Sequence, residues 1–189
     1  MLMLKESKID QGAYVDPSSS ILGDVTIGRG VYIAPNSSIR ADEPGSKIVI
    51  EDECNIQDNV IVHALSGSTV HIGAGSTLAH GCIVHGPCTI GKGCFIGFGS
   101  IAFDCILMDG CVVLHRALVI NTNVPRSRLV CNGAILDGAP AGEDLPEVPV
   151  HYRRFAESVR EMNIELASMY RRSRADDLNR LFGGEHQRN

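Results

Sequence analysis

Tryptophan is absent from this chain of 189 residues, and aromatic residues make up only 5% of it. Glycine is abundant by contrast, with 20 residues, and valine and isoleucine together outnumber leucine. Branched aliphatic residues favour strands, and glycine favours tight turns. The composition therefore indicates many short strands joined by turns rather than a helical bundle.

Other features that the sequence lacks exclude several classes of protein. No apolar stretch approaches the length of a membrane span, and the opening residues MLMLKESK have neither a long apolar core nor a cleavage-site pattern. The net charge of −5 gives a nucleic-acid partner little electrostatic support. The seven cysteines include no CxxC pair. An odd number of cysteines without a secretion signal predicts a cytoplasmic protein, with no membrane and no nucleic-acid partner.

The sequence does contain a repeat of six residues, and this repeat dominates the chain. Apolar residues recur at every sixth position, with interruptions at 43–47 and 64–68, and continue unbroken from Ile72 to Ile120. The positions in phase are Val15, Ile21, Ile27, Ile33, Ile39, Ile50, Ile56, Val62, Ile72, Leu78, Val84, Ile90, Ile96, Ala102, Met108, Leu114 and Ile120. Beyond Ile120 the repeat fades, which predicts one last irregular coil.

Repeats of this kind form one short strand and one turn each, and three of them make a triangular coil. Stacked coils lie about 4.8 Å apart, with the in-phase side chains pointing inward. The predicted fold is an all-β solenoid, a parallel β-helix of hexapeptide repeats, over residues 1–145. Residues 146–189 are predicted as a linker and a C-terminal α-helix, which packs along the solenoid or against a neighbour. Its apolar face follows helical spacing: Phe155, Val159, Met162, Leu166 and Met169.

The cysteines follow the same repeat. Some stand four residues after an in-phase position, where small side chains fit inside a corner of the coil and are expected to be buried. These are Cys54, Cys82, Cys88 and Cys94. Cys105 and Cys111 stand one position earlier in the repeat, which predicts greater exposure.

The register of the repeat predicts where the histidines in the middle of the chain lie. Arg40, His63 and His85 each follow an in-phase residue directly. They fall on the same face once each interruption is counted as an outward loop. They should form an outward column in which His63 and His85 lie one coil apart. On the preceding face, Asp58 and His80 occupy the same corner in successive coils.

His80 is not expected to join His63 and His85 within one chain. The segment between His80 and His85 spans up to about 16 Å along one edge of the triangle. A zinc–nitrogen bond is about 2.0–2.1 Å long, so the ligand backbones must lie much closer together. The neighbouring chain's His80 can complete a site. Threefold packing of solenoids then predicts a homotrimer with one metal site per interface.

A single outward histidine is usually a solvated surface group or a local hydrogen-bond partner. That is the expectation for the remaining histidines, which are His71, His115, His151 and His186. Two histidines stacked on one face beneath an arginine are different. Like bases in contact bring no structural benefit unless something positive lies between them, so His63 and His85 indicate a metal site.

The predicted ligand set has a chemical consequence. Three neutral imidazoles on a divalent ion leave one position open for water, which marks a catalytic metal site. Such an ion lowers the pKa of its water to about 7 and so supplies hydroxide at neutral pH. Gln57 is placed to orient that hydroxide, and Glu43, in the loop above, to accept its proton. Arg40 and Asp58 belong to opposite columns, which predicts a salt bridge across the subunit interface.

These residues resemble a known family. SIRADE at 38–43, NIQDNVIVHAL at 55–65 and STLAHGCIVHGP at 76–87 look like the signature of the γ-class carbonic anhydrases. LPEV at 145–148, followed by a helix, is similar too. The resemblance covers nearly the whole chain. It implies a left-handed β-helix, a homotrimer, and Zn²⁺ as the metal, with Fe²⁺ or Co²⁺ as alternatives.

The resemblance also implies roles for residues. His63, His80 and His85 match the metal ligands of the family, and Glu43 and Gln57 match its active-site glutamate and glutamine. The remaining matches are to interface ion-pair residues and to asparagines near the active site: Arg40, Asp42 and Asp58 for the former, and Asn55 and Asn163 for the latter.

The chain departs from the family in two places. A long acidic loop between the first two histidines is replaced by ALSGSTVH, and the active-site tyrosine of the terminal helix aligns with Glu161. The predicted function is reversible hydration of CO₂ to bicarbonate by metal-bound hydroxide at trimer interfaces. The alternatives are a CoA-dependent acyltransferase, an acyl-CoA thioesterase and a catalytically silent metal-binding scaffold. A transferase needs no stacked histidines, so His63 and His85 argue against the first alternative.

Overall fold

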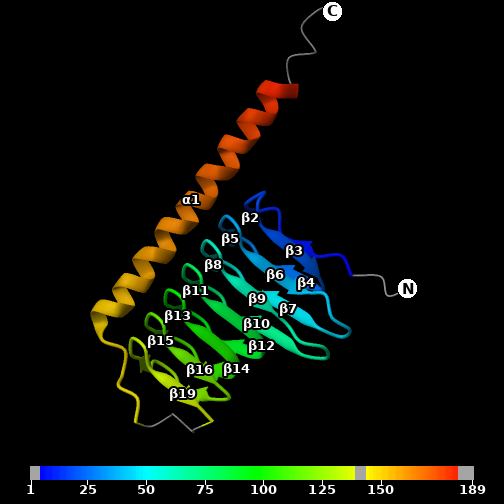
Figure 1. Ribbon diagram of the computed structural model, residues 1–189. Coiled ribbons are helices and arrows are strands. Elements are labelled where there is room, and N and C mark those ends of the chain that lie inside the picture. The colour runs from blue at the N-terminus through cyan, green and yellow to red at the C-terminus, as the bar shows by residue number, and fades with distance from the viewer. Residues whose placement is uncertain (1–4, 139–143, 183–189) are drawn as a thin grey trace, which may run out of the picture.

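The computed structural model describes residues 5–138 and 144–182. Within these residues the chain winds into a solenoid of parallel strands, followed by one helix, α1 (Val150–Phe182). Figure 1 shows the coils stacked in chain order, with α1 running back along them from the last coils to the first. The predicted parallel β-solenoid with a C-terminal helix is confirmed. The boundary at 145 stays a prediction, and residues 1–4, 139–143 and 183–189 of the two predicted units lie outside the described residues.

The strands form three faces. The covered face, over which α1 lies, contains β2 (Tyr14–Val15), β5 (Tyr32–Ile33), β8 (Asn55–Ile56), β11 (Thr77–Leu78), β13 (Phe95–Ile96), β15 (Val112–Val113) and β18 (Leu129–Val130). The histidine face contains β3 (Ser20–Gly23), β6 (Ser38–Ala41), β9 (Ile61–His63), the first parts of β12 (Ile83–Ile90) and β14 (Ile101–Leu107), β16 (Leu118–Ile120) and β19 (Ile135–Asp137). The third face contains β1 (Lys8–Ile9), β4 (Val25–Ile27), β7 (Lys47–Ile50), β10 (Thr69–Ile72), the second parts of β12 and β14, and β17 (Asn123–Val124).

Aliphatic side chains fill the interior of the coils. Ile33, Ile56, Leu78 and Ile96 are completely buried, and the parallel pairing of their strands stacks each on the next. Each coil therefore contributes its in-phase residues to one continuous core. Branched and straight aliphatic side chains suffice for this narrow interior, which explains how the chain folds with so few aromatic residues.

The predicted phase is wrong after Ala102. The side chains that point inward stand one position earlier than predicted: Leu107, Val113 and Val119, in place of Met108, Leu114 and Ile120. The pairing of β12 with β14 shifts register at the corner between the two faces, so that Ile90 pairs with Leu107. At this corner Asp104 has a positive φ of 48°. The coil is one residue shorter there, which moves every later inward position by one.

The same shift explains the cysteines. The predicted burial of the first group is confirmed for Cys54, Cys82, Cys88 and Cys94. The greater exposure predicted for Cys105 and Cys111 is wrong, because both are buried. Cys105 pairs in register with Cys88 and so occupies the same inward position in the next coil. All seven cysteines are free, and Cys131 is exposed.

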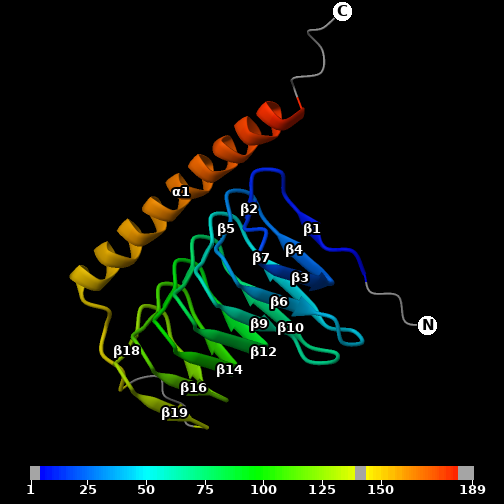
Figure 2. The same cartoon turned by 45° about the horizontal axis from the view of Figure 1, so that its top comes forward.

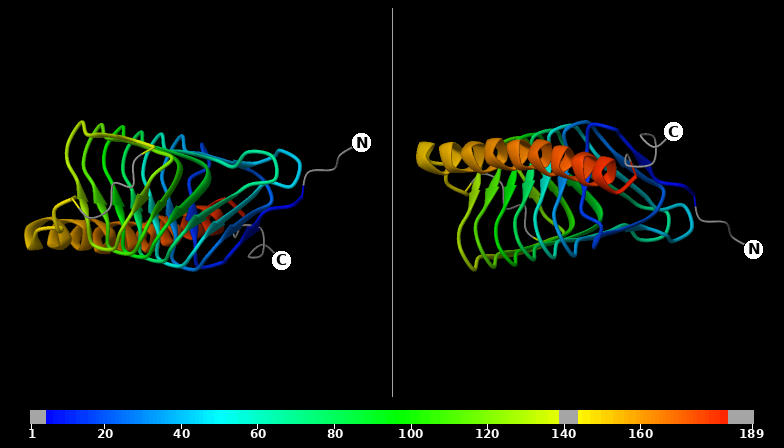
Figure 3. Two further views of the ribbon diagram at one scale, coloured as in Figure 1. Left: turned by 90° about the horizontal axis from the view of Figure 1, so that it is seen from below. Right: turned by 90° about the horizontal axis from the view of Figure 1, so that it is seen from above.

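Helix α1 packs on the covered face, as both views in Figure 3 show. Its apolar contacts include Tyr152, Ala156, Val159 and Ala167. The ring of Phe155 also lies 5.6 Å from that of Phe95, and the ring of Tyr170 lies 5.2 Å from that of Tyr14. The apolar face predicted for the helix is therefore only partly right. Phe155 and Val159 belong to the packed face, whereas Met162 and Met169 are 57% and 51% exposed. No helix in the described part of the chain is long and apolar enough to cross a membrane.

Two loops project from the corner between the histidine face and the third face. They contain the predicted interruptions at 43–47 and 64–68, and Figure 2 shows them extending past β7 and β10. The loops stack on each other, since the N–H of Gly67 donates to the carbonyl of Pro44 at 2.9 Å. They therefore form a fixed rim beside the histidine face.

Candidate metal site

His63 and His85 contact each other across neighbouring coils of the histidine face. The pairing of β9 with β12 places them at one register position, and the pairing of β6 with β9 adds Arg40 in the preceding coil. Nδ1 of His63 lies 3.1 Å from Nε2 of His85. The ring planes meet at 71°. Arg40, His63 and His85 thus form one outward column.

Loop carboxylates lie on the far side of His63. Nε2 of His63 is 3.5 Å from Oδ1 of Asp42 and 3.5 Å from Oε1 of Glu43. Oδ1 of Asp42 is buried and has no hydrogen-bond partner among the described residues. Arg40 lies beside the same groups, with its Nη2 3.4 Å from Nε2 of His63 and its Nε 3.5 Å from Oδ2 of Asp42. Nε2 of His63 thus lies between a carboxylate and a guanidinium, and it accepts a hydrogen bond from Arg40.

Glu43 is held by the second loop. Its Oε2 accepts hydrogen bonds from the N–H and the hydroxyl of Ser66, at 2.7 and 2.8 Å. These two bonds lower the pKa of Glu43 below its ordinary value, because they stabilise the ionised carboxylate. Glu43 is thus ionised at neutral pH and presents Oε1 toward His63. An ionised carboxylate in this place can accept a proton.

His80 lies at the corner between the covered face and the histidine face, in the same coil as His85. Its Nδ1 is 2.9 Å from Oδ2 of Asp58, and its backbone N–H donates to Oε1 of Gln57 at 3.2 Å. The ring of Phe98, in the next coil, lies 5.5 Å away between centroids. The side chain of His80 is 53% exposed. His80 is thus held by its own chain while more than half of its side chain stays exposed.

An apolar pocket of about 390 Å³ adjoins His80, between α1 and the solenoid. It brings together three predicted site residues, Gln57, His80 and Asn163. The apolar lining comes from Phe95, Phe98, Phe155, Val159 and Met162. Asn55 does not line this pocket. It is completely buried in β8, and neither polar atom of its side chain has a partner in the described part of the chain.

The predicted residues that contact one another form two half-sites on one chain. The paired half-site consists of Arg40, Asp42, Glu43, His63 and His85. The pocket half-site consists of Gln57, Asp58, His80 and Asn163. Among the described residues of one chain, no three His, Cys, Asp or Glu side chains gather as a metal site. A site with three histidines would therefore need both half-sites, from different chains.

The three histidines fit a divalent metal ion. Two of the imidazoles have an acceptor beside Nδ1: the carbonyl of Gly86 for His85, and Asp58 for His80. Nε2 of His63 is held by Arg40, with Asp42 at 3.5 Å. Metal-ligating histidines typically have such an acceptor at the nitrogen away from the metal. The nitrogens left over are Nδ1 of His63 and Nε2 of His85 and His80. Two nitrogens on one tetrahedral zinc ion lie about 3.3 Å apart, close to the 3.1 Å between His63 and His85.

Sequence reasoning missed a row of apolar side chains beside this column. We define the apolar ladder as Ile61, Ile83, Ile101, Leu118 and Ile135, which pair in register from coil to coil on the histidine face. Its ends are the most accessible, with Ile61 41% and Ile135 71% exposed. Each member stands directly before an inward residue, so the repeat itself could have revealed the ladder.

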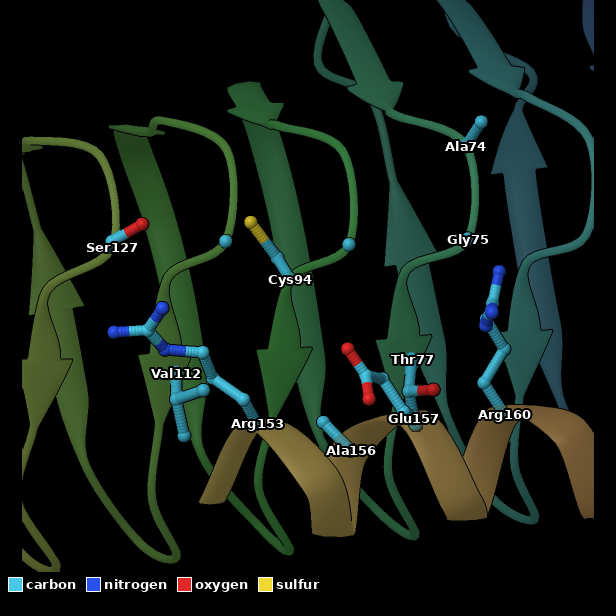
Figure 4. A pocket seen from close by; sticks show the side chains of 12 residues that line it. Ala74, Gly75, Thr77, Cys94, Val112, Ser127, Arg153, Ala156, Glu157 and Arg160 are labelled. Carbon is cyan, nitrogen blue, oxygen red and sulfur yellow. The ribbon is translucent and has the colours of Figure 1, made fainter. Parts of the chain in front are cut away.

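A second pocket, of about 280 Å³, lies along the opposite edge of α1. Figure 4 shows Arg153, Glu157 and Arg160 reaching from the helix toward the turns that contain Gly75 and Ser127. None of the predicted site residues lines this pocket. The candidate metal site therefore involves only the edge of α1 that faces His80.

Comparisons with known proteins identify the repeat first and the family second. A family model described as bacterial transferase hexapeptide (six repeats) matches residues 6–41 and 69–102. The crystal structure of a hexapeptide transferase family protein from Anaplasma phagocytophilum is similar, with a TM-score of 0.68 at 29% identity. The match covers 87% of this chain and 92% of that one. The fold and the repeat thus define a hexapeptide-repeat protein.

Proteins of similar sequence identify the family within this class. The carbonic anhydrase of Methanosarcina thermophila is 33% identical over an alignment of 184 residues, and the match covers 86% of this chain and 74% of that protein. A carboxysome assembly protein of Nostoc is 38% identical over an alignment of 177 residues, and the match covers 88% of this chain. This chain spans only about a third of the Nostoc protein, 32% of its length. The chain belongs to the γ-class carbonic anhydrase family.

Proposed function

We propose that this protein hydrates CO₂ reversibly to bicarbonate at the interfaces of a homotrimer. A divalent metal ion, Zn²⁺ or alternatively Fe²⁺ or Co²⁺, would be held by His63 and His85 of one chain and His80 of the next. The observation that carries the proposal is the 3.1 Å contact between ring nitrogens of His63 and His85. When bound, such an ion lowers the pKa of water to about 7 and supplies hydroxide at neutral pH.

The apolar ladder supports assembly through the histidine face. A continuous row of outward aliphatic side chains, half-buried in the middle and exposed at both ends, is typical of a surface that a partner covers. In a threefold assembly with its axis along the solenoid, equivalent coils of neighbouring chains lie at the same height. His80 and His85 belong to one coil, so His80 of one chain would meet His85 of the next at that height. Each interface would then contain one complete set of three histidines.

The other residues have separate tasks in this proposal. The amides of Gln57 and Asn163 line the pocket beside His80 and would orient CO₂ and the attacking water. The apolar wall of that pocket suits CO₂, which is neutral and carries no hydrogen-bond donor. Glu43 would take the proton at Oε1, which is the atom turned toward His63. Arg40 would pair with Asp58 of the neighbouring chain and so fix the distance between half-sites.

The other predicted functions differ in what they require. An acyltransferase or thioesterase would need a CoA site, and a silent scaffold would bind the metal without turnover. Because one relative is named as a carboxysome assembly protein, a scaffold is the second candidate function. A cytoplasmic location belongs to the proposal, since all seven cysteines are free and a reducing compartment would preserve them.

Complementation between two inactive variants tests the shared site. His80→Ala and His85→Ala should each abolish metal binding, because each removes one of only three protein ligands. When the two variants are co-expressed, an interface that takes His80 from one and His85 from the other is complete. Random mixing in threefold trimers restores about one quarter of the interfaces. Co-expression of His80→Ala with the double variant His80→Ala/His85→Ala should restore none.

Metal content by elemental analysis and CO₂ hydration by stopped flow are the two measurements. Anaerobically prepared, metal-loaded protein should accelerate hydration, and the mixed trimers should recover activity in proportion to their metal. A metal-loaded protein that fails to accelerate hydration would establish the scaffold instead. Retention of metal by His80→Ala would show that the site does not lie between chains.

A further inference from the structure

Asp58 contacts the imidazole of His80 within a single chain. Oδ2 of Asp58 is 2.9 Å from Nδ1 of His80, and the two residues occupy the same corner in successive coils. The backbone of His80 is tied to the same segment, because its N–H donates to Oε1 of Gln57 at 3.2 Å. Two adjacent residues of one coil thus hold the backbone and the ring of His80. This arrangement determines which ring nitrogen can face a ligand.

An ionised carboxylate only accepts hydrogen bonds, so the neutral imidazole beside it must carry its hydrogen on Nδ1. The lone pair then lies on Nε2, the nitrogen that points away from Asp58. We propose that Asp58 is a positioning residue that fixes His80 in the Nδ1–H tautomer and presents Nε2 to the metal. The metal part of this inference rests on the proposed function, whereas the tautomer is a property of the single chain.

The sequence predicts a different task for Asp58, a salt bridge with Arg40 of the neighbouring chain. The two tasks use different oxygens, because Oδ2 contacts His80 and Oδ1 is left for Arg40. Side chains of Asp58 and His80 are 40% and 53% exposed, so their contact contributes little to stability. The contact matters because it orients the imidazole ring of His80. Asparagine separates the two tasks, since its carbonyl oxygen still accepts from Nδ1–H but carries no charge for Arg40.

Nitrogen-15 NMR of the metal-free protein tests the tautomer. The spectra are recorded well above the ordinary imidazole pKa of about 6.5, and His80→Gln assigns the signals. Wild type and Asp58→Asn should show Nδ1–H at His80, and Asp58→Ala should shift toward Nε2–H. Glu51→Ala is the matched control, because it removes the carboxylate 3.1 Å from Nε2 of His71 on the third face. It should leave the His80 signals unchanged.

Metal affinity, measured by competition with a chelator, tests the positioning role. Asp58→Ala should bind Zn²⁺ about 10- to 100-fold more weakly than wild type, as loss of an outer-shell partner does. Asp58→Asn should stay within a few-fold of wild type at protein concentrations where sedimentation shows the same assembly. Glu51→Ala should match wild type.

The two ways of failing are distinguishable. An Nε2–H tautomer at His80 in the wild type would overturn the inference and leave the proposed metal site standing. Equal Zn²⁺ affinity of Asp58→Ala and wild type would do the same. A wild type with the Nδ1–H tautomer that binds no metal would overturn the proposed function, and the positioning role with it.

Discussion

The two half-sites differ in how completely one chain builds them. In the paired half-site, His63 and His85 contact each other, and their outer nitrogens face Asp42, Glu43 and a backbone carbonyl. In the pocket half-site, His80 has one carboxylate partner, and more than half of its side chain is exposed. Strand register and the two loops place the residues of the paired half-site. The residues of the pocket half-site lie at a corner of the coil and on α1, and the imidazole of His80 is left exposed there.

This difference shows what each part of the fold contributes to the proposed site. Parallel register stacks side chains from successive coils at one spacing, which suits two ligands of one metal ion. It cannot bring in a third ligand from another edge of the same triangle. In the proposed site the third would come from a second chain, which would make assembly and metal binding one event. Predictions about the interface therefore have the largest expected effects.

A charge on the apolar ladder should separate the half-sites altogether. Ile101→Asp would place a carboxylate where neighbouring chains are proposed to meet, and an unpaired buried charge costs several kcal/mol. The trimer should dissociate in sedimentation velocity, and metal should be lost because His80 no longer meets His63 and His85. Ile106→Asp is the matched control, since Ile106 lies on the third face and is 43% exposed. A trimeric, metal-loaded Ile101→Asp protein would exclude assembly through the histidine face.

A charge beneath α1 should affect the pocket half-site alone. Ala167 is buried against Tyr14 and Tyr32, so Ala167→Glu forces a larger, charged side chain under the helix. Overpacking of this kind costs about 1–3 kcal/mol and should loosen the later part of α1. Asn163 lies one turn earlier and would shift, which lowers the rate of CO₂ hydration.

Metal content should stay unchanged in Ala167→Glu, because α1 supplies no ligand to the proposed site. Hydrogen exchange along α1 gives the direct measure of loosening. Met169→Glu serves as the control, since Met169 is 51% exposed. Loss of metal from Ala167→Glu would mean that the helix also supports the ligands, contrary to the division between half-sites.

Much of this architecture could be predicted from the sequence, because the repeat encodes position directly. A six-residue period fixed which side chains point inward and placed Arg40, His63 and His85 in one column. The period fails after Ala102, where a corner loses one residue and Asp104 takes a left-handed conformation. Simple counting cannot detect such a deletion, because Met108 continues the apolar pattern as well as Leu107 does.

Contacts between elements were harder to predict. The apolar spacing along 155–169 indicates a helix and includes Phe155, which contacts the solenoid, but it omits Ala156 and Ala167, which pack there too. Close approach of a helix to a flat sheet favours small side chains, which a search for large apolar residues overlooks. The contact between Asp58 and His80 was missed for a similar reason. Residues in neighbouring coils can meet by register, yet rotamers decide whether they do.

The smallest predicted effect concerns the proton acceptor of the paired half-site. Ser66→Ala removes the hydroxyl bond to Oε2 of Glu43 and keeps the backbone N–H bond. Because the hydroxyl bond is the largest cause of the lowered pKa, the pKa of Glu43 should rise toward its ordinary value. Carbon-13 NMR titration of the Glu43 carboxyl group measures this. Ser68→Ala is the control, since that hydroxyl donates to the carbonyl of Leu65 in the same loop.

A higher pKa makes Glu43 a better proton acceptor while it remains ionised at neutral pH. The shortened loop between His63 and His71 contains no acidic residue to pass the proton onward. We therefore expect kcat of the wild type to rise with the concentration of an imidazole-type buffer, with kcat/KM nearly constant. Ser66→Ala should reach the same kcat at slightly lower buffer concentration. A kcat that ignores buffer in both proteins would show that another group, such as Glu161, carries the proton, and that Glu43 does not limit its departure.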